Sequence, residues 1–268
     1  MAATTWTPSE QCTEVFARLS GDYNPVHLDP EFAKAAGFPT TIVHGMCVIG
    51  AAARAAHASA PAQSMLKKLD VRFANPVLPT QQVMFEPELK EVGDGVRVKL
   101  EATLDDGNRV MSPAAFTFGP ASASDDPADA DSFAPDDEDI LGDPYQFNAE
   151  QIAEYTGITR PTETVADEGT PAMVALLGMT GALEKAFTGQ APERAGTWVH
   201  LRQAGIFYRP IEEGVSYVCR IQGGRIKVRK SALGAYLTIP FVVETCDDGG
   251  LVATGGCTLL YAFEKDED

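Results

Sequence analysis

Apolar and polar positions along residues 1–119 follow a pattern that predicts two short helices, one long helix and four strands. The short helices are expected at 8–20 and, after Asp29-Pro30, at 30–36. Residues 44–60 are apolar nearly all round and rich in alanine, which indicates a helix buried on most faces. The strands are expected at 66–74, 81–91, 95–105 and 108–118. One buried helix followed by an antiparallel meander predicts a sheet curled around that helix.

The same order of segments recurs later in the chain, which indicates a tandem repeat. Four blocks match in order: Glu14–Pro25 with Glu150–Pro161, Gly45-Met46 with Gly178-Met179, Val71–Val77 with Gly205–Ile211, and Thr103–Gly107 with Thr245–Gly249. One matching block could be chance, whereas four in the same order indicate a duplication of one α+β unit. The repeat is too long for a solenoid. We therefore expect a first domain at 1–119, a linker at 120–144 and a second domain at 145–268.

The segment between the copies is acidic and offers almost nothing to bury. Residues 121–143 carry nine acidic residues and no basic one, whereas the whole chain carries 38 acidic and 21 basic residues, a net charge of −17. More than half of the net charge lies in this segment, so we expect a solvated linker. A chain this acidic is a poor partner for nucleic acid or for an anionic membrane.

Cysteines and histidines show no spacing typical of a disulfide framework or a metal site. The five cysteines contain no CxxC pair, and the four histidines contain no HExxH pattern, so we expect no metal. The first residues lack a basic stretch followed by an apolar run, and the most apolar stretch, 42–56, is too short and broken to cross a bilayer. These features predict a cytoplasmic protein without a membrane span.

Candidate chemistry concentrates in one loop, where Asp22, Asn24 and His27 lie within six residues. Gly21 and Pro25 indicate irregular backbone there, and reactive side chains are commonly displayed on loops. A carboxylate and an imidazole side by side can divide the work of proton transfer. An Asn-Pro turn with a surface histidine is the simpler interpretation of the same residues.

The second copy favours the functional interpretation. It keeps the glycine and the proline as Gly157 and Pro161, but Ile158, Arg160 and Glu163 stand in place of the three polar residues. A turn alone would not need all three polar groups in one copy and none in the other. We therefore expect a functional first half and a structural second half.

These residues carry a resemblance to a known family. The stretch Ser20–His27, followed by Phe32–Phe38 and Ile42–Met46, strongly resembles the MaoC-like R-specific enoyl-CoA hydratase family, and Val71–Val77 is similar to that family's strand after the central helix. The resemblance covers most of residues 10–120, and the second half resembles the degenerate repeat of the double-hotdog members. It implies a double hotdog, in which two antiparallel sheets each wrap around a long helix. Here the degenerate copy comes second, whereas in familiar members it comes first.

The resemblance also implies an activity and roles for four residues. Asp22 and His27 would bind one water and add it across the double bond of a trans-2-enoyl-CoA to give the (3R)-3-hydroxyacyl-CoA, or run the reverse dehydration. Asn24 would orient that water. The N–H of Gly45 would bind the thioester oxygen, a role that also follows from the unpaired N–H groups and the dipole at the start of a helix. Coenzyme A would then be part of the substrate, and no separate cofactor is expected.

Two alternatives stay open at this point: a dehydratase for 3-hydroxyacyl groups on acyl carrier protein, and a non-catalytic subunit that binds acyl thioesters. A homodimer and a monomeric pseudo-dimer are both compatible with the sequence. The shorter segment before the second helix could leave room for a long or bulky acyl tail, lined by Met173, Leu176, Leu177 and Met179. The candidate contacts for coenzyme A phosphates are basic residues, namely Lys67, Arg72, Arg225, Lys227 and Arg229.

Overall fold

The computed structural model describes residues 3–120, 133–162, 172–187, 196–232 and 234–263. The elements of the first half are β1 (Thr4–Trp6), α1 (Cys12–Ser20), a 3-10 turn (Pro25–His27), α2 (Pro30–Ala35), α3 (Gly45–His57), β2 (Ser64–Phe73), β3 (Val83–Val92), β4 (Gly95–Leu104) and β5 (Arg109–Pro120). The second half follows with β6 (Ile140–Leu141), α4 (Ala149–Thr159), a 3-10 turn (Ala172–Leu176), α5 (Met179–Phe187), β7 (Gly196–Phe207), β8 (Tyr217–Ile221), a 3-10 turn (Gly223–Arg225), β9 (Lys227–Ser231), β10 (Gly234–Thr245) and β11 (Leu251–Phe263).

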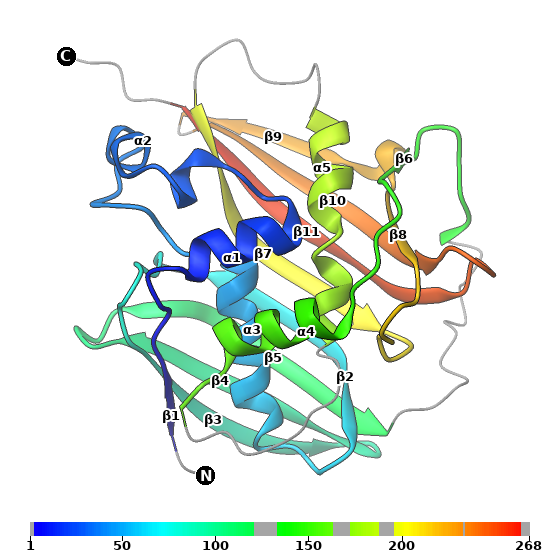
Figure 1. Ribbon diagram of the computed structural model, residues 1–268, viewed down its shortest axis with the longest axis horizontal. Coiled ribbons are helices and arrows are strands. Elements are labelled where there is room, and N and C mark those ends of the chain that lie inside the picture. Colours follow the sequence, from blue (N-terminus) through cyan, green and yellow to red (C-terminus); the bar gives the residue numbers. More distant parts are fainter. Residues whose placement is uncertain (1–2, 121–132, 163–171, 188–195, 233, 264–268) are drawn as a thin grey trace.

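All described strands join one antiparallel sheet in the order β1-β3-β4-β5-β2-β7-β11-β10-β8-β6, with β9 paired to β10. The two halves meet where β2 pairs with β7, from Lys68 opposite Ile206 to Arg72 opposite Arg202. Figure 1 shows α1, α3, α4 and α5 together in front of this sheet. The helix followed by a meander that the sequence predicted is present in each half.

The long helix α3 is buried because its side chains are small and apolar. Ten of its residues, from Cys47 to Ala56, are buried, and α3 packs against β2, β3, β4 and β5. Gly50 lets the second half approach closely, since a Cβ there would lie 2.2 Å from the hydroxyl oxygen of Tyr155 on α4. The predicted helix at 44–60 is thus confirmed, with ends a few residues shorter.

The end of the predicted linker is part of the second domain rather than a solvated spacer. Residues Ile140–Leu141 form β6 and pair with β8. Asp139 and Arg220 form an ion pair whose side chains are only 5% and 4% exposed, and Arg220 also bonds Glu244 at 2.9 Å. The sequence could not show that one of many aspartates has a buried arginine partner. Most of the acidic segment, 121–132, lies outside the described residues.

The two loops that the repeat placed in register differ in backbone. Gly21 ends α1 in the left-handed conformation, with φ +76°, which glycine adopts without strain. Gly157 instead lies inside α4, which continues to Thr159 and ends before Pro161. The second copy thus keeps the glycine and the proline but not the backbone turn at the glycine, and within the described residues the loop that displays polar groups is found in the first copy.

Candidate active site

The loop after α1 is held by its own polar groups. The side chain of Asn24 accepts a hydrogen bond from Val26 N–H at 3.3 Å and so begins the 3-10 turn that carries His27. The backbone N–H of Asn24 in turn donates to Asp22 Oδ1 at 3.2 Å. Asn24 Nδ2–H also donates to the carbonyl of Trp198 on β7 at 3.2 Å. These contacts make Asn24 a residue that fastens the loop to the second half.

His27 is buried and its tautomer is fixed by the backbone. Its Nδ1–H donates to the carbonyl oxygen of Ile42 at 2.8 Å, which leaves Nε2 with a lone pair in the neutral ring. Burial lowers the pKa of His27, and the charge of Asp22 and the hydrogen bond to Ile42 oppose that shift. The ring is therefore neutral near pH 7 and can accept a proton at Nε2.

His44 holds the loop in place from the residue before α3. It is 1% exposed, and its Nε2–H donates to the backbone carbonyl of Asp22 at 3.0 Å. Its ring stacks on His27 with 3.8 Å between centroids. Burial, and then the neighbouring His27, lower the pKa of His44 to about 3. A neutral His44 thus ties the Asp22 backbone to the start of α3.

Asp22, His27 and His44 each place one polar atom within 4.8 Å of the others. That spacing lets a single water contact the Asp22 carboxylate and His27, since two hydrogen bonds of about 2.8 Å span it. The same three residues are close enough to be considered as metal ligands. In both histidines, however, one ring nitrogen already bonds a backbone carbonyl, which leaves one nitrogen of each ring for any other ligand.

Gly45 is the first residue of α3, so its N–H is one of the helix-start donors without a partner inside the helix. The space beside it is narrow. A Cβ on Gly45 would lie 2.9 Å from Cζ of Phe73 and 3.2 Å from Nδ1 of His200. Glycine therefore keeps open the approach to the positive end of the helix dipole.

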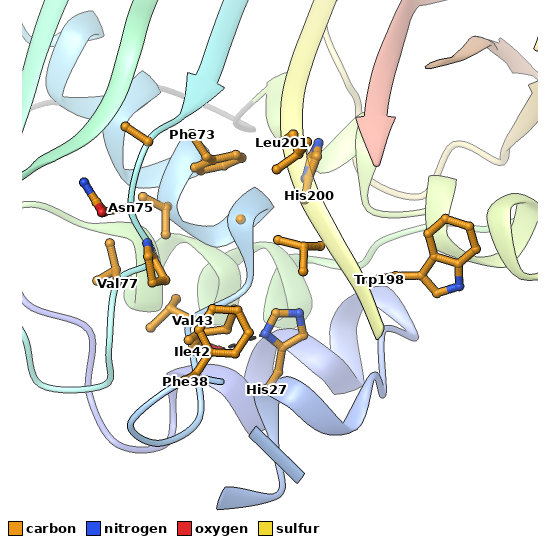
Figure 2. A pocket seen from close by; sticks show the side chains of 15 residues that line it. His27, Phe38, Ile42, Val43, Phe73, Asn75, Val77, Trp198, His200 and Leu201 are labelled. Carbon is orange, nitrogen blue, oxygen red and sulfur yellow. Dashed lines mark hydrogen bonds between the residues drawn. The ribbon is translucent and has the colours of Figure 1, made fainter. Parts of the chain in front are cut away.

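A cavity of about 120 Å³ is lined by His27 and by Gly45, whereas Asp22, Asn24 and His44 are not among its lining residues. Figure 2 shows His27 and Ile42 on one side of it and Phe73 and His200 on the other. Its wall comes from the loop before α3, from the end of β2 and from residues 198–201 of β7. Met173, Leu176, Leu177 and Met179, which the sequence suggested as a lining for a long acyl tail, are instead buried in the core and are not part of this wall.

His200 on β7 lines the cavity, although the sequence did not single it out as a site residue. Leu259 pairs with His200 and Thr258 with Arg202, so Leu201 is an extra residue in a β-bulge. The bulge turns His200 toward the cavity while Arg202 faces the opposite side of the sheet. Strict alternation would have put both residues on one face, and the sequence carries no signal for the bulge.

The orientation of His200 is also fixed by the backbone. Its Nε2–H donates to the carbonyl of Arg202 at 3.0 Å, and Nδ1 faces the start of α3. Burial lowers the pKa of His200 to about 4, although the hydrogen bond to Arg202 opposes the shift. The second half thus contributes a neutral hydrogen-bond acceptor to the cavity.

The basic residues suggested as coenzyme contacts lie in different places. Arg72 and Arg229 line one groove together with Arg202, which the sequence did not single out. Lys67 lies beside Gly119 on β5. Arg225, in its 3-10 turn, and Lys227, on β9, are outside the residues that line that groove.

The equivalent position in the second half is filled. A Cβ on Gly178, which precedes α5, would lie 2.1 Å from Cε1 of Tyr145. The Tyr145 hydroxyl donates to the carbonyl of Ala175 at 2.5 Å, which holds the ring over the start of α5. Leu177 precedes Gly178 as His44 precedes Gly45, and it is buried. Glu163, the counterpart of His27, lies outside the described residues.

Comparisons with known proteins agree with this division. Residues 2–108 match the family model described as "MaoC like domain". The chain is 38% identical to the Arabidopsis thaliana protein named "Enoyl-CoA hydratase 2, peroxisomal" over 96 residues, 35% of this chain and 30% of that protein. It is 41% identical to the Mycobacterium tuberculosis protein named "3-hydroxyacyl-thioester dehydratase Y" over 75 residues, 27% of this chain and 26% of that protein. The match spans less than a third of either relative.

The whole chain resembles a solved structure. A Mycobacterium tuberculosis protein whose title states a double hotdog fold covers 96% of this chain, and the chain covers 93% of it, with a TM-score of 0.68 and 15% identity. At that identity the similarity shows the fold, and the chain is a double hotdog as predicted. Within the described residues, no helix has the length and apolar character needed to cross a membrane.

Proposed function

The first half of this chain, residues 2–108, belongs to the MaoC-like domain family, and from that premise we propose that the protein is a hydro-lyase that reversibly hydrates a trans-2-enoyl thioester to the (3R)-3-hydroxyacyl thioester. One observation carries the proposal. A neutral His27, whose Nδ1–H is already bonded to a backbone carbonyl, lies close to the Asp22 carboxylate, and His27 lines a cavity that also reaches the start of a buried helix. General base, charged partner and oxyanion donor are thus within one small space.

Asp22 and His27 would share the water. His27 Nε2 accepts a proton from the water as its oxygen bonds to Cβ of the enoyl group, and the carboxylate of Asp22 stabilises the imidazolium that forms. A proton then bonds to Cα and the ring returns to its neutral state. The double bond is consumed, one C–O and one C–H bond are formed, and no redox partner is needed.

The N–H of Gly45 would bind the thioester oxygen as negative charge develops on it. A donor that is already oriented at a helix start stabilises that charge without reorganising, and removal of one such donor costs about 10²–10³ in rate in a well-studied case. Asn24 would act as a positioning residue, because its amide links the loop to Trp198. The catalytic loop therefore depends on the second half for its position.

The size of the cavity favours a short acyl group. An engineered protein cavity of about 150 Å³ holds a benzene molecule, and the cavity here measures about 120 Å³. A four-carbon enoyl group suits that volume, whereas a ten-carbon chain would have to extend beyond the cavity. We therefore propose a short acyl group, where the sequence alone suggested a long or bulky tail.

The test is a panel of crotonyl-, octenoyl- and decenoyl-CoA, followed by loss of the absorbance of the conjugated thioester. We expect hydration with the highest kcat/KM on crotonyl-CoA, and a product that a (3R)-specific dehydrogenase oxidises. Hydrolysis to free thiol instead of hydration would contradict the proposed chemistry. A (3S) product would contradict the proposed geometry, and a preference for decenoyl-CoA would contradict the size argument alone.

A further inference from the structure

Two cysteines that the proposed mechanism does not use lie side by side in the first half. Sγ of Cys12, the first residue of α1, is 3.2 Å from Sγ of Cys47 in the first turn of α3. Both residues are fully buried. The sulfurs of a disulfide are about 2.05 Å apart, so an approach of about 1.2 Å would allow this pair to bond.

The pair encloses the active site along the chain. The catalytic residues proposed above all lie between the two cysteines, within Asp22–Gly45. A bond between Cys12 and Cys47 would therefore close a ring that contains the whole catalytic segment. In the second half, the register of the repeat places Asn148 and Thr180 at the two positions. The thiol pair thus belongs to the half that carries the active site.

The two thiols differ in their surroundings. Cys12 begins α1 directly after the exposed residues 9–11, whereas Cys47 lies inside the buried helix α3. Helix ends open more readily than helix interiors, so loosening of the first turn of α1 gives a small oxidant access to Cys12. Burial, and then the hydrogen bond with Cys12, raise the pKa of the Cys47 thiol, so Cys47 keeps its proton. Cys12 is therefore the sulfur that reacts first.

A buried hydroxyl from the second half lies near the pair. Tyr155 belongs to α4, which packs against both α1 and α3. Its side-chain oxygen has no hydrogen-bond partner within the described residues. Burial, and then Cys47, raise the pKa of Tyr155, so the hydroxyl keeps its proton and can donate to an oxidised sulfur.

We propose that Cys12 and Cys47 form a site of reversible oxidation, at which hydrogen peroxide produces a disulfide that lowers the activity. The effect on activity rests on the function proposed above, whereas formation of the bond does not. The sulfur of the Cys12 thiolate attacks one oxygen of the peroxide, the O–O bond breaks, and the leaving oxygen takes the electron pair and a proton to become water. Cys12 is then a sulfenic acid.

The second step joins the two residues. The Cys47 sulfur loses its proton and attacks the sulfenic sulfur of Cys12, the S–O bond breaks, and a second water leaves. The two thiols together lose two electrons, and the peroxide gains them. A thiol reductant reverses the change by thiol–disulfide exchange.

The bond would disturb the start of α3. The N–H of Cys47 donates to the carbonyl of His44 at 3.0 Å, and Gly45 lies between these two residues. A shift of Cys47 toward Cys12 therefore moves the turn that presents the Gly45 N–H. Since a misplacement of about 1 Å can lower a rate about 10²-fold, we expect kcat to fall at least about tenfold.

The experiment reads the bond and the activity separately. Cys246 is exposed and can link two chains, so every protein carries Cys246→Ser. After treatment with hydrogen peroxide, mass spectrometry of a tryptic digest looks for peptide 1–18 joined to peptide 35–54 with the loss of two hydrogens. The kcat for crotonyl-CoA is measured before oxidation, after it, and after reduction with dithiothreitol.

The joined peptide should form, with kcat at least about tenfold lower and restored by dithiothreitol. Cys47→Ala should form no joined peptide and should keep its kcat in peroxide. Cys219→Ala, which removes a buried thiol on β8, is the matched control and should behave as the parent protein does.

Other results overturn the inference. Oxidised protein without the joined peptide would show that the two cysteines are packing residues only. A joined peptide with unchanged kcat, or an equal loss of kcat in Cys47→Ala, would show that the bond does not control the activity. If the unoxidised protein hydrates no thioester, the proposed function fails, and the digest alone then decides whether the thiol pair is a site of oxidation.

Discussion

Gly45→Ala should abolish most of the activity while leaving the fold intact. The new Cβ would lie 2.9 Å from Cζ and 3.0 Å from Cε2 of Phe73, and 3.2 Å from Nδ1 of His200. Both neighbours are side chains that can shift by a few tenths of an ångström. Alanine is also about 0.5–1 kcal/mol more favourable than glycine within a helix, so the free energy of unfolding should change by less than about 1 kcal/mol.

The effect on catalysis has a different origin. The methyl group occupies the space through which a thioester oxygen would reach the Gly45 N–H. Loss of that contact should lower kcat about a hundredfold, the lower end of the range for one oxyanion donor. Hydration of crotonyl-CoA gives the rate, and urea unfolding gives the stability. Gly181→Ala in α5 is the matched control, because a Cβ there meets no atom within 4 Å.

The control should keep full activity and equal or greater stability. A Gly45→Ala protein that hydrates within twofold of wild type would refute the assignment of this helix start as the oxyanion site. A Gly45→Ala protein that loses several kcal/mol of stability would refute the packing argument, because the neighbouring rings would then be unable to yield.

Three further predictions follow from buried groups. His44 has a pKa of about 3 in the folded state and about 6.5 when unfolded, so acid protonates the unfolded chain first. The free energy of unfolding should therefore fall by about 1.4 kcal/mol per pH unit below pH 6.5 because of His44. When unfolding by urea is measured from pH 7 to 5, this free energy should fall less steeply with pH in His44→Gln than in the wild type. Asp139→Ala leaves the buried Arg220 charge without one carboxylate and should cost about 3 kcal/mol in thermal or urea unfolding, whereas the exposed Asp137→Ala should cost almost nothing. Tyr145 fills the space at the start of α5, so calorimetry with a non-reactive crotonyl-CoA analogue should give one binding site per chain. Two sites per chain would contradict the claim that the second half binds no substrate.

Local sequence signals predicted most of the first half. The apolar run before Ala58 could only be a buried helix, and Gly21, Asn24 and Pro25 carry the backbone preferences that shape the loop with Asp22 and His27. Asp22 and His27 were predicted as functional residues because the second copy of the repeat has other residues at their positions. These features depend on neighbours in sequence, which is why the pattern alone revealed them.

The rest depends on contacts between distant residues. The bulge at Leu201 turns His200 into the cavity, yet no residue type near it requires a bulge. Asp139 is one of many aspartates in an acidic segment, and only its distant partner Arg220 makes it structural. Gly157 shows the converse error, since identity with Gly21 in an alignment did not bring the same backbone conformation.

The most direct test of the central claim is the hydration rate of crotonyl-CoA in Asp22→Asn and in His27→Gln, each compared with a matched control. Asp29→Asn changes the same chemistry at a helix cap that asparagine can also form, and His57→Gln changes a histidine that bonds a backbone carbonyl at the far end of α3. We expect each active-site variant to lose about 10²–10⁴ in kcat with an unchanged fold, as for other general acid–base groups, and both controls to retain wild-type rates. Near wild-type hydration by folded Asp22→Asn or His27→Gln would contradict the account.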